Sequence, residues 1–144
     1  MKQFFVGVGA IIEKDGKVLV LKRSPEKDFG ANVWEVVTGR VEAEEDPKQT
    51  LLREVKEEVN LSVEIVTPID TGFFYRGGKD YPMIFIVFWC RYLEGEVKLS
   101  WEHSEYKWLT LKKAIDDKRF SPFIERFKII QKLKQYLPKD FKYA

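Results

Sequence analysis

Residues 39–61 read GRVEAEEDPKQTLLREVKEEVNL and contain a helix whose beginning is marked twice. Asp46 can accept hydrogen bonds from the free amides of a first turn, and Pro47 suits the first helical position. These signals predict a helix over residues 47–59, with about 3.6 residues per turn. Four aliphatic residues then share one face of the helix: Leu51, Leu52, Val55 and Val59. Three glutamates share a neighbouring face: Glu54, Glu57 and Glu58.

The crowded carboxylates admit two explanations. Like charges four residues apart destabilise an isolated helix by roughly 0.2–0.5 kcal/mol per pair. One explanation is a solvated acidic face that Arg53 and Lys56 partly neutralise. The other is a site for a divalent cation such as Mg²⁺, which takes oxygen ligands from carboxylates and substrate phosphates. Helical spacing alone does not choose between them.

Strands and short helices are predicted around this helix. Asp15-Gly16 separates two apolar runs and predicts a β-hairpin near the N-terminus. Further β-rich stretches lie at residues 62–66, 71–76, 83–92 and 106–109. A short helix is expected after Thr110, which can cap it. Strands combined with a central and a terminal helix predict a sheet that is covered on both faces.

The final helix is expected to begin at Ser121-Pro122, a capping residue followed by a proline. Its apolar side chains recur at helical spacing: Phe123, Phe127, Ile130, Leu133 and Leu137. This stripe could bind a partner helix, but packing on the sheet of the same domain is the commoner reason for such a pattern.

The composition is that of one ordinary globular domain. The 144 residues include 25 Lys+Arg and 23 Asp+Glu, so the net charge is only +2. Nucleic-acid and membrane-surface proteins need a patch of one sign, so we expect neither partner. No apolar run approaches the roughly 20 residues of a membrane-spanning helix. Cys90 lies in an apolar stretch and is expected to be a buried thiol in a reducing, cytoplasmic environment.

The stretch from residue 39 to residue 61 resembles the signature of the Nudix hydrolases. Eight residues occupy its fixed positions: Gly39, Glu45, Arg53, Glu54, Val55, Glu57, Glu58 and Leu61. Asn60 stands where the family has Gly, and Asn is the next most tolerated residue in a left-handed helix terminus. Trp34-Glu35 also fits the family's approach to the motif. The resemblance implies an α/β protein with the Nudix fold, an α/β/α sandwich with a central mixed β-sheet. It implies one domain over residues 1–144, with the Nudix box at residues 39–61.

Three segments resemble one branch of the family, the dihydroneopterin triphosphate pyrophosphatases, which also hydrolyse deoxynucleoside triphosphates such as dATP. They are Val37-Thr38-Gly39, which replaces the usual Pro-Gly-Gly, and residues 53–59 and 102–109.

The resemblance assigns roles to the residues of the box. Glu54, Glu57 and Glu58 would bind Mg²⁺, for which Mn²⁺ can substitute, and the Gly39 carbonyl would add an oxygen. Arg53, counted with the catalytic group, would form an ion pair with Glu45 that orients the helix and its loop.

Glu102 is the candidate for an additional carboxylate outside the box, acting as a metal ligand or general base. The alternative is a surface-loop glutamate. His103 beside it could contact phosphate, although a lone exposed or structural histidine is the commoner case.

Candidates for substrate binding lie before the box. Lys22 and Arg23 could pair with substrate phosphates, and Thr38 and Gly39 could contact the substrate. Solvated charges and a turn hydroxyl are the alternatives. Six aromatic residues could stack on a ring: Trp34, Phe73, Phe74, Tyr75, Trp89 and Trp101.

The expected activity is Mg²⁺-dependent cleavage of a nucleoside triphosphate or of dihydroneopterin triphosphate to the monophosphate and pyrophosphate. Other expected substrates are oxidised nucleotides, dinucleoside polyphosphates and ADP-ribose. A catalytically silent Nudix domain that only binds a nucleotide is the alternative from a different class. The protein is expected to act as a monomer or homodimer.

Overall fold

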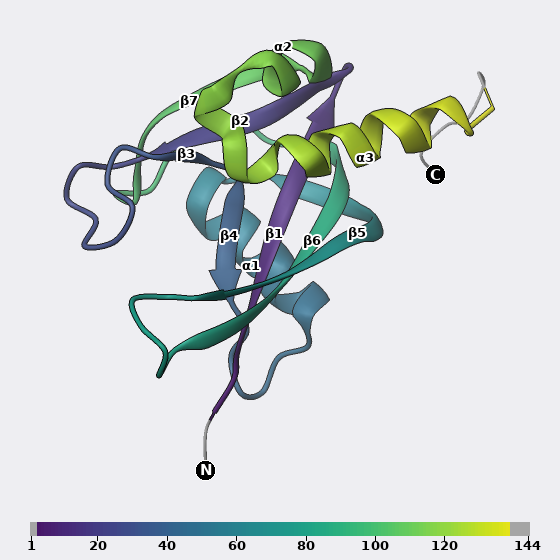
Figure 1. Cartoon of the computed structure of the whole chain (residues 1–144). Coiled ribbons are helices and arrows are strands. Elements are labelled where there is room, and N and C mark those ends of the chain that lie inside the picture. The colour runs from purple at the N-terminus through teal and green to yellow at the C-terminus, as the bar shows by residue number, and fades with distance from the viewer. Residues whose placement is uncertain (1–2, 139–144) are drawn as a thin grey trace.

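The computed structural model describes residues 3–138, which form a sheet between two helical layers (Figure 1). Its strands are β1 (Phe5–Lys14), β2 (Lys17–Arg23), β3 (Trp34–Glu35), β4 (Val37–Arg40), β5 (Ser62–Tyr75), β6 (Pro82–Glu94) and β7 (His103–Thr110). Its helices are α1 (Pro47–Val59), α2 (Leu111–Asp116), the 3₁₀ helix η1 (Lys118–Phe123) and α3 (Ile124–Gln135).

The sheet is mixed, as expected. Its main path runs β3-β2-β1-β6-β5, with β4 paired to β1 and β7 paired to β2. β1 and β6 are parallel over residues 5–13, and the other pairs are antiparallel. The β1–β2 hairpin turns at Asp15-Gly16, where both residues have positive φ. That turn confirms the hairpin prediction.

Two apolar cores occupy the two faces of the sheet. On one face, α1 contributes Leu51, Val55 and Val59 to a cluster with strand residues such as Val8. On the other face, α2, η1 and α3 cover a second cluster. In Figure 1, α3 crosses one side of the sheet while α1 lies behind it. The sandwich prediction is therefore confirmed.

Leu52 does not belong to the buried face of α1. Its side chain is 44% exposed, whereas Leu51 is buried. The prediction that Leu52 shares one face with Leu51, Val55 and Val59 was wrong, because neighbouring residues on a helix lie about 100° apart and only one can face the sheet squarely. Cys90 is fully buried, as expected.

β5 is one long strand where two separate stretches were expected. It pairs with β6 along its length, with register shifts on either side of Pro68. Pro68 cannot donate a ladder hydrogen bond, but a proline is tolerated at a sheet edge and at bulges. The proline therefore bends the strand without ending it.

The last helix begins later than expected. Ser121 and Pro122 lie within η1, and α3 starts at Ile124 without a side-chain cap. Phe127 and Ile130 are fully buried against the sheet. This burial confirms that the helix packs on its own sheet, although Leu133 is 37% exposed. The short helix α2 has the predicted cap, because the Thr110 side chain accepts a hydrogen bond from the Lys113 amide.

Over residues 3–138, no helix has both the length and the apolar character needed to cross a membrane.

Candidate active site

Both ends of α1 are fixed by local interactions. The Asp46 carboxylate accepts hydrogen bonds from the amides of Lys48 and Gln49, and the Gln49 side chain accepts one from the Asp46 amide. Asn60 ends the helix in the left-handed conformation, at φ 63° and ψ 30°. Its amide donates to the Lys56 carbonyl, so it performs the role that the sequence predicted. These caps fix where the helix begins and ends, and the packing of Leu51, Val55 and Val59 in the core sets which face meets the sheet.

The three glutamates of α1 lie at different depths. The side chain of Glu58 is 2% exposed, that of Glu54 is 16% exposed, and that of Glu57 is 58% exposed. Glu58 therefore faces the interior at the margin of the apolar core, while Glu57 faces solvent. The explanation as a uniformly solvated acidic face does not fit Glu54 or Glu58.

Arg53 connects the helix to the preceding loop. Its Nε and Nη2 donate to the two oxygens of Glu45, each over 2.8 Å. Its Nη1 donates to Glu54 Oε1 at 2.9 Å and to Glu57 Oε2 at 3.2 Å. Hydrogen bonding to Arg53 lowers the pKa of Glu45 to about 2. The predicted Arg53–Glu45 pair is thus present, and it is bidentate, a geometry that restricts the guanidinium orientation.

Gly39 lies directly beneath Glu54. A Cβ atom at position 39 would lie 2.2 Å from Cγ and 2.5 Å from Cδ of Glu54. Ordinary contacts between carbon atoms are about 3.5–4.0 Å long. Only glycine leaves room for this glutamate, so the first residue of the box and its central glutamate form one packing unit.

Glu58 carries an unmatched buried oxygen. Among residues 3–138, its Oε2 has no hydrogen-bond partner. Burial, followed by the charges of Glu54, Glu102 and Glu35, raises the pKa of Glu58 to about 10. Burial also raises the pKa of Glu54. Buried carboxylates that repel one another are stabilised by a cation bound between them.

Glu102 is brought to Glu58 by a segment that lies along the end of α1. The Lys98 amide donates to the Val59 carbonyl, and the Ser100 amide donates to the Glu58 carbonyl. The strand β7 then begins at His103. This chain path explains why the charge of Glu102 acts on Glu58, although 44 residues of sequence separate them.

Glu35 and His103 complete the buried side of the site, and sequence reasoning gave neither this role. His103 Nε2 donates to Glu35 Oε2 at 2.8 Å, and its Nδ1 lies 3.7 Å from Glu58 Oε1. His103 is therefore a structural histidine, the commoner case, but buried instead of exposed. Alternation along β3 could have indicated Glu35, since Trp34 faces the opposite core.

Arg23 contacts protein groups in this arrangement. Its Nη1 donates to Glu35 Oε2 at 3.0 Å, and its Nε donates to the Phe29 carbonyl at 2.9 Å. Thr38 Oγ1 donates to Glu35 Oε1 over a long 3.4 Å. Lys22 pairs with Trp34, whose side chain packs in the core on the other face of the sheet, and directly opposed strand residues lie on the same face. Arg23 and Thr38 thus lie near the carboxylates, whereas Lys22 lies on the other face.

Lys27 is a further residue that sequence reasoning missed. It lies in the loop between β2 and β3, and its Nζ is 3.0 Å from Glu102 Oε2. No local pattern marked it, because the two partners are 75 residues apart in the chain.

The aromatic candidates divide into two groups. Trp34 and Trp89 are buried in the core, so stacking on a substrate is unavailable to them. The exposed candidates are Phe73, Phe74, Tyr75 and Trp101. The first three lie together at the end of β5, and Trp101 adjoins Glu102.

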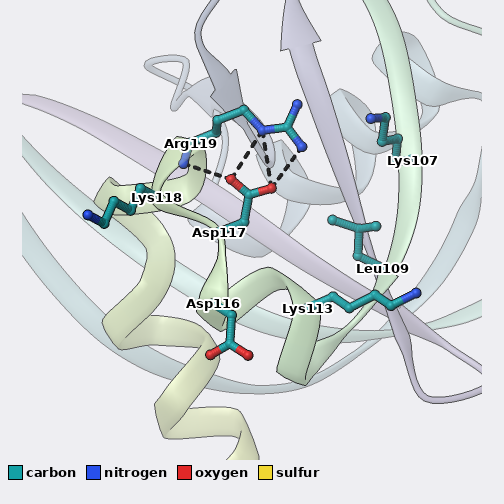
Figure 2. Close-up of a pocket in the computed structure, with 7 residues that line it drawn as sticks. All are labelled: Lys107, Leu109, Lys113, Asp116, Asp117, Lys118 and Arg119. Atoms are coloured by element: carbon teal, nitrogen blue, oxygen red, sulfur yellow. Dashed lines mark hydrogen bonds and ion pairs between the residues drawn. The ribbon is translucent and has the colours of Figure 1, made fainter.

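A hollow of about 450 Å³ lies elsewhere, against β7, α2 and η1 (Figure 2). It is lined by Lys107, Leu109, Lys113, Asp116, Asp117, Lys118 and Arg119. Within it, Arg119 is bound to Asp117 by several hydrogen bonds, including one of 2.7 Å. No predicted site residue lines this hollow, so its volume does not make it the active site.

The residues at the carboxylate site fit a hard divalent cation. Across residues 3–138, no three acidic, imidazole or thiol side chains already converge as a finished ligand set. Glu57 Oε2 accepts a hydrogen bond from Arg53 at 3.2 Å, and the Glu57 side chain is 58% exposed. The oxygen chemistry, the unmatched Glu58 Oε2 and the proximity of Glu54 and Glu102 nevertheless match the ligands that Mg²⁺ takes.

Comparison with known proteins identifies the family. The NUDIX domain model matches residues 3–130. The CTP pyrophosphohydrolase of Escherichia coli K12 is 41% identical over 58 residues, which cover 40% of this chain and 42% of that relative. The nucleoside triphosphatase NudI of E. coli K12 / DH10B is 30% identical over 108 residues, which cover 69% of this chain and 77% of NudI.

A solved structure, the MutT protein from Methanosarcina mazei Go1, superposes with a TM-score of 0.79. It is 31% identical, and the match covers 91% of this chain and 97% of that structure. With a family model that spans nearly the whole described chain and a fold that agrees, this protein belongs to the Nudix hydrolase family.

Proposed function

We propose that this protein is a Mg²⁺-dependent pyrophosphohydrolase that cleaves a nucleoside triphosphate to the monophosphate and pyrophosphate. The observation that carries the proposal is the placement of Glu58, buried with an unmatched oxygen beside Glu54 and Glu102. Such a group of carboxylates needs a cation, and a cation held there can hold a polyphosphate.

The protein groups have distinct tasks in this proposal. Glu54, Glu58 and Glu102, with Glu57 after a side-chain rotation, would hold the cation, and the Gly39 carbonyl would add an oxygen. When bound, Mg²⁺ supplies charge stabilisation to the phosphate oxygens and lowers the pKa of a water. Arg53 keeps Glu54 in place through its bonds to Glu45 and Glu54.

Charge and position, and not a protein nucleophile, carry this chemistry. The ring of His103, the histidine of the chain, is buried against Glu35, and no serine or cysteine side chain is hydrogen-bonded to it in the described part of the chain. A carboxylate of the site, with Glu102 the first candidate, would accept the proton of the attacking water.

The relatives support a triphosphate substrate. One E. coli relative, NudI, is named a nucleoside triphosphatase, and the other is named a CTP pyrophosphohydrolase. Dihydroneopterin triphosphate is the second candidate, and the sequence features that favour it are Val37-Thr38-Gly39 and residues 102–109. Both substrates carry the same triphosphate, so the carboxylate site would act on them identically.

A substrate panel tests the proposal. Purified protein with Mg²⁺ is given dATP, CTP, 8-oxo-dGTP, dihydroneopterin triphosphate, diadenosine tetraphosphate and ADP-ribose, and the release of pyrophosphate or monophosphate is measured. We expect the highest kcat/KM among the triphosphates. Preference for diadenosine tetraphosphate or ADP-ribose would refute the substrate class. Tight nucleotide binding without turnover of any compound would instead indicate a silent binding domain.

A further inference from the structure

We propose that Lys27 covers Glu102 while no substrate is bound and moves to a substrate phosphate when the triphosphate arrives. This inference rests on the proposed function, because it concerns the same carboxylates. It adds a substrate-binding residue from the β2–β3 loop, outside the Nudix box.

The position of Lys27 is unusual for a lysine in a surface loop. Its side chain is only 12% exposed, and its Nζ lies 3.0 Å from Glu102 Oε2. The same Nζ lies 5.1 Å from the centre of the Trp101 ring, a cation–π distance. Trp101 itself is 69% exposed, so an exposed aromatic ring lies beside the ammonium group. The ammonium group is therefore held beside Glu102 by two neighbours from one segment.

The loop that carries Lys27 is anchored without its side chain. The Ser24 amide donates to the Glu102 carbonyl at 2.8 Å, and the Arg23 amide donates to the Val33 carbonyl at 2.9 Å. The Asn32 amide donates to the Arg23 carbonyl at 3.0 Å. Because the backbone holds the two segments together, the Lys27 side chain can change partners while the loop stays docked.

Charge balance gives the direction of the exchange. With Lys27 bound, one oxygen of Glu102 is occupied by an ammonium group and is less available to a cation. A triphosphate held by a cation at these carboxylates would bring several negative oxygens close to the same ammonium, because Lys27 is bonded to Glu102. A lysine has three rotatable donors on a flexible four-carbon stem, so it can pass from carboxylate to phosphate without moving the backbone. Substrate binding would thereby free the Glu102 oxygen to bind the cation that accompanies the triphosphate.

Mn²⁺ binding to the substrate-free protein gives a readout that does not depend on activity. Removal of the ammonium in Lys27→Met should tighten Mn²⁺ binding on the order of fivefold, the factor expected from loss of a competing, partly exposed ion pair. In the Glu102→Gln background, Lys27→Met should leave Mn²⁺ affinity unchanged, because the competed ligand is gone. Lys112→Met removes the same charge from an exposed site on α2 and is the matched control, with wild-type affinity expected.

Substrate kinetics test whether Lys27 binds a substrate phosphate. Lys27→Met should raise KM for the preferred triphosphate on the order of tenfold, since a charge-assisted contact to phosphate is lost. Lys27→Arg keeps the charge and should retain most of the wild-type KM. If Lys27→Met does not fold, Lys27→Gln is used, and thermal unfolding of each variant is recorded first.

Unchanged or weaker Mn²⁺ binding in the folded Lys27→Met protein would overturn the proposal, and so would an unchanged KM. If the Lys27–Glu102 ion pair only stabilised the fold, Lys27→Met would lower the unfolding temperature without tightening Mn²⁺ binding. If the wild-type protein hydrolyses nothing in the panel, the proposed function fails, whereas the Mn²⁺ titration still decides whether Lys27 covers Glu102.

Discussion

Substitution of Gly39 by alanine tests the packing between the first residue of the box and its central glutamate, Glu54. The added Cβ would lie 2.2 Å from Glu54 Cγ, at least about 1 Å closer than an ordinary carbon contact. Cγ is near the backbone of α1 and cannot swing away as a side-chain tip can, so Glu54 must change its rotamer or the helix must shift. Either movement displaces the Glu54 carboxylate by about 1 Å or more.

The size of the effect follows from that displacement. Misplacement of a reacting group by about 1 Å can lower the rate about 10²-fold, which corresponds to ~2.7 kcal/mol of activation free energy. Overpacking of this kind also destabilises a fold by about 1–3 kcal/mol. We therefore expect Gly39→Ala to lose about 99% of kcat and to unfold at a lower urea concentration.

The assay compares triphosphate hydrolysis and urea unfolding for Gly39→Ala and a matched control, Gly72→Ala. A Cβ at Gly72 would meet only the end of the Arg126 side chain, at 2.9 Å, which can move aside. The control should keep wild-type kcat. In a Glu54→Ala background the clash with Cγ disappears, so Gly39→Ala should then destabilise the protein much less. Wild-type kcat in Gly39→Ala, or an equal loss of stability in both backgrounds, would refute the reasoning.

Three further predictions concern stability and reactivity. Arg53 lowers the pKa of Glu45 from 4.5 to about 2, so their pair stabilises the fold above pH 4.5 and the contribution is lost as the pH falls toward 2. Glu45→Gln should therefore lower the urea midpoint at pH 7 more than at pH 2.5. Burial raises the pKa of the Cys90 thiol, so it should react with a disulfide reagent at pH 8 only after unfolding in urea. Asn60→Val should destabilise the protein by about 1–2 kcal/mol, because the left-handed conformation disfavours a β-branched residue, while Asn60→Gly should change stability little.

Each of these three predictions has an outcome that would contradict it. An equal midpoint shift at both pH values would mean that Glu45 acts by something other than its charge. Rapid labelling of Cys90 in the native protein would contradict its burial. Equal stability of Asn60→Val and the wild type would show that the left-handed terminus is not needed.

Local signals predicted the parts of the fold that depend on neighbouring residues. Asp46 and Pro47 mark the beginning of α1, and Asp15-Gly16 marks the first hairpin turn, because capping and turn formation involve residues close in sequence. The late start of α3 was missed because Ser121-Pro122 carries the same local signal as a helix start, yet the chain there forms a 3₁₀ turn.

The buried side of the candidate active site depends on contacts distant in sequence. His103 and Glu35 are 68 residues apart, and Lys27 and Glu102 are 75 residues apart. Neither pair has a periodic or motif signature, so only the assembled sheet and loops bring the partners together. The carboxylates of α1 were predicted as a group, but the burial of Glu58 and the exposure of Glu57 depend on the sheet beneath the helix.

In the proposed function, buried Glu58 holds the cation that binds the polyphosphate. Glu58→Gln keeps the shape of the side chain and removes the negative charge. Because burial raises the pKa of Glu58 to about 10, a neutral amide should be tolerated and the unfolding temperature should not fall. The decisive measurement is kcat for the preferred triphosphate across a Mg²⁺ titration, in wild type and Glu58→Gln. We predict a loss on the order of 10²-fold or more in the folded variant; equal kcat in the two proteins would contradict the metal site.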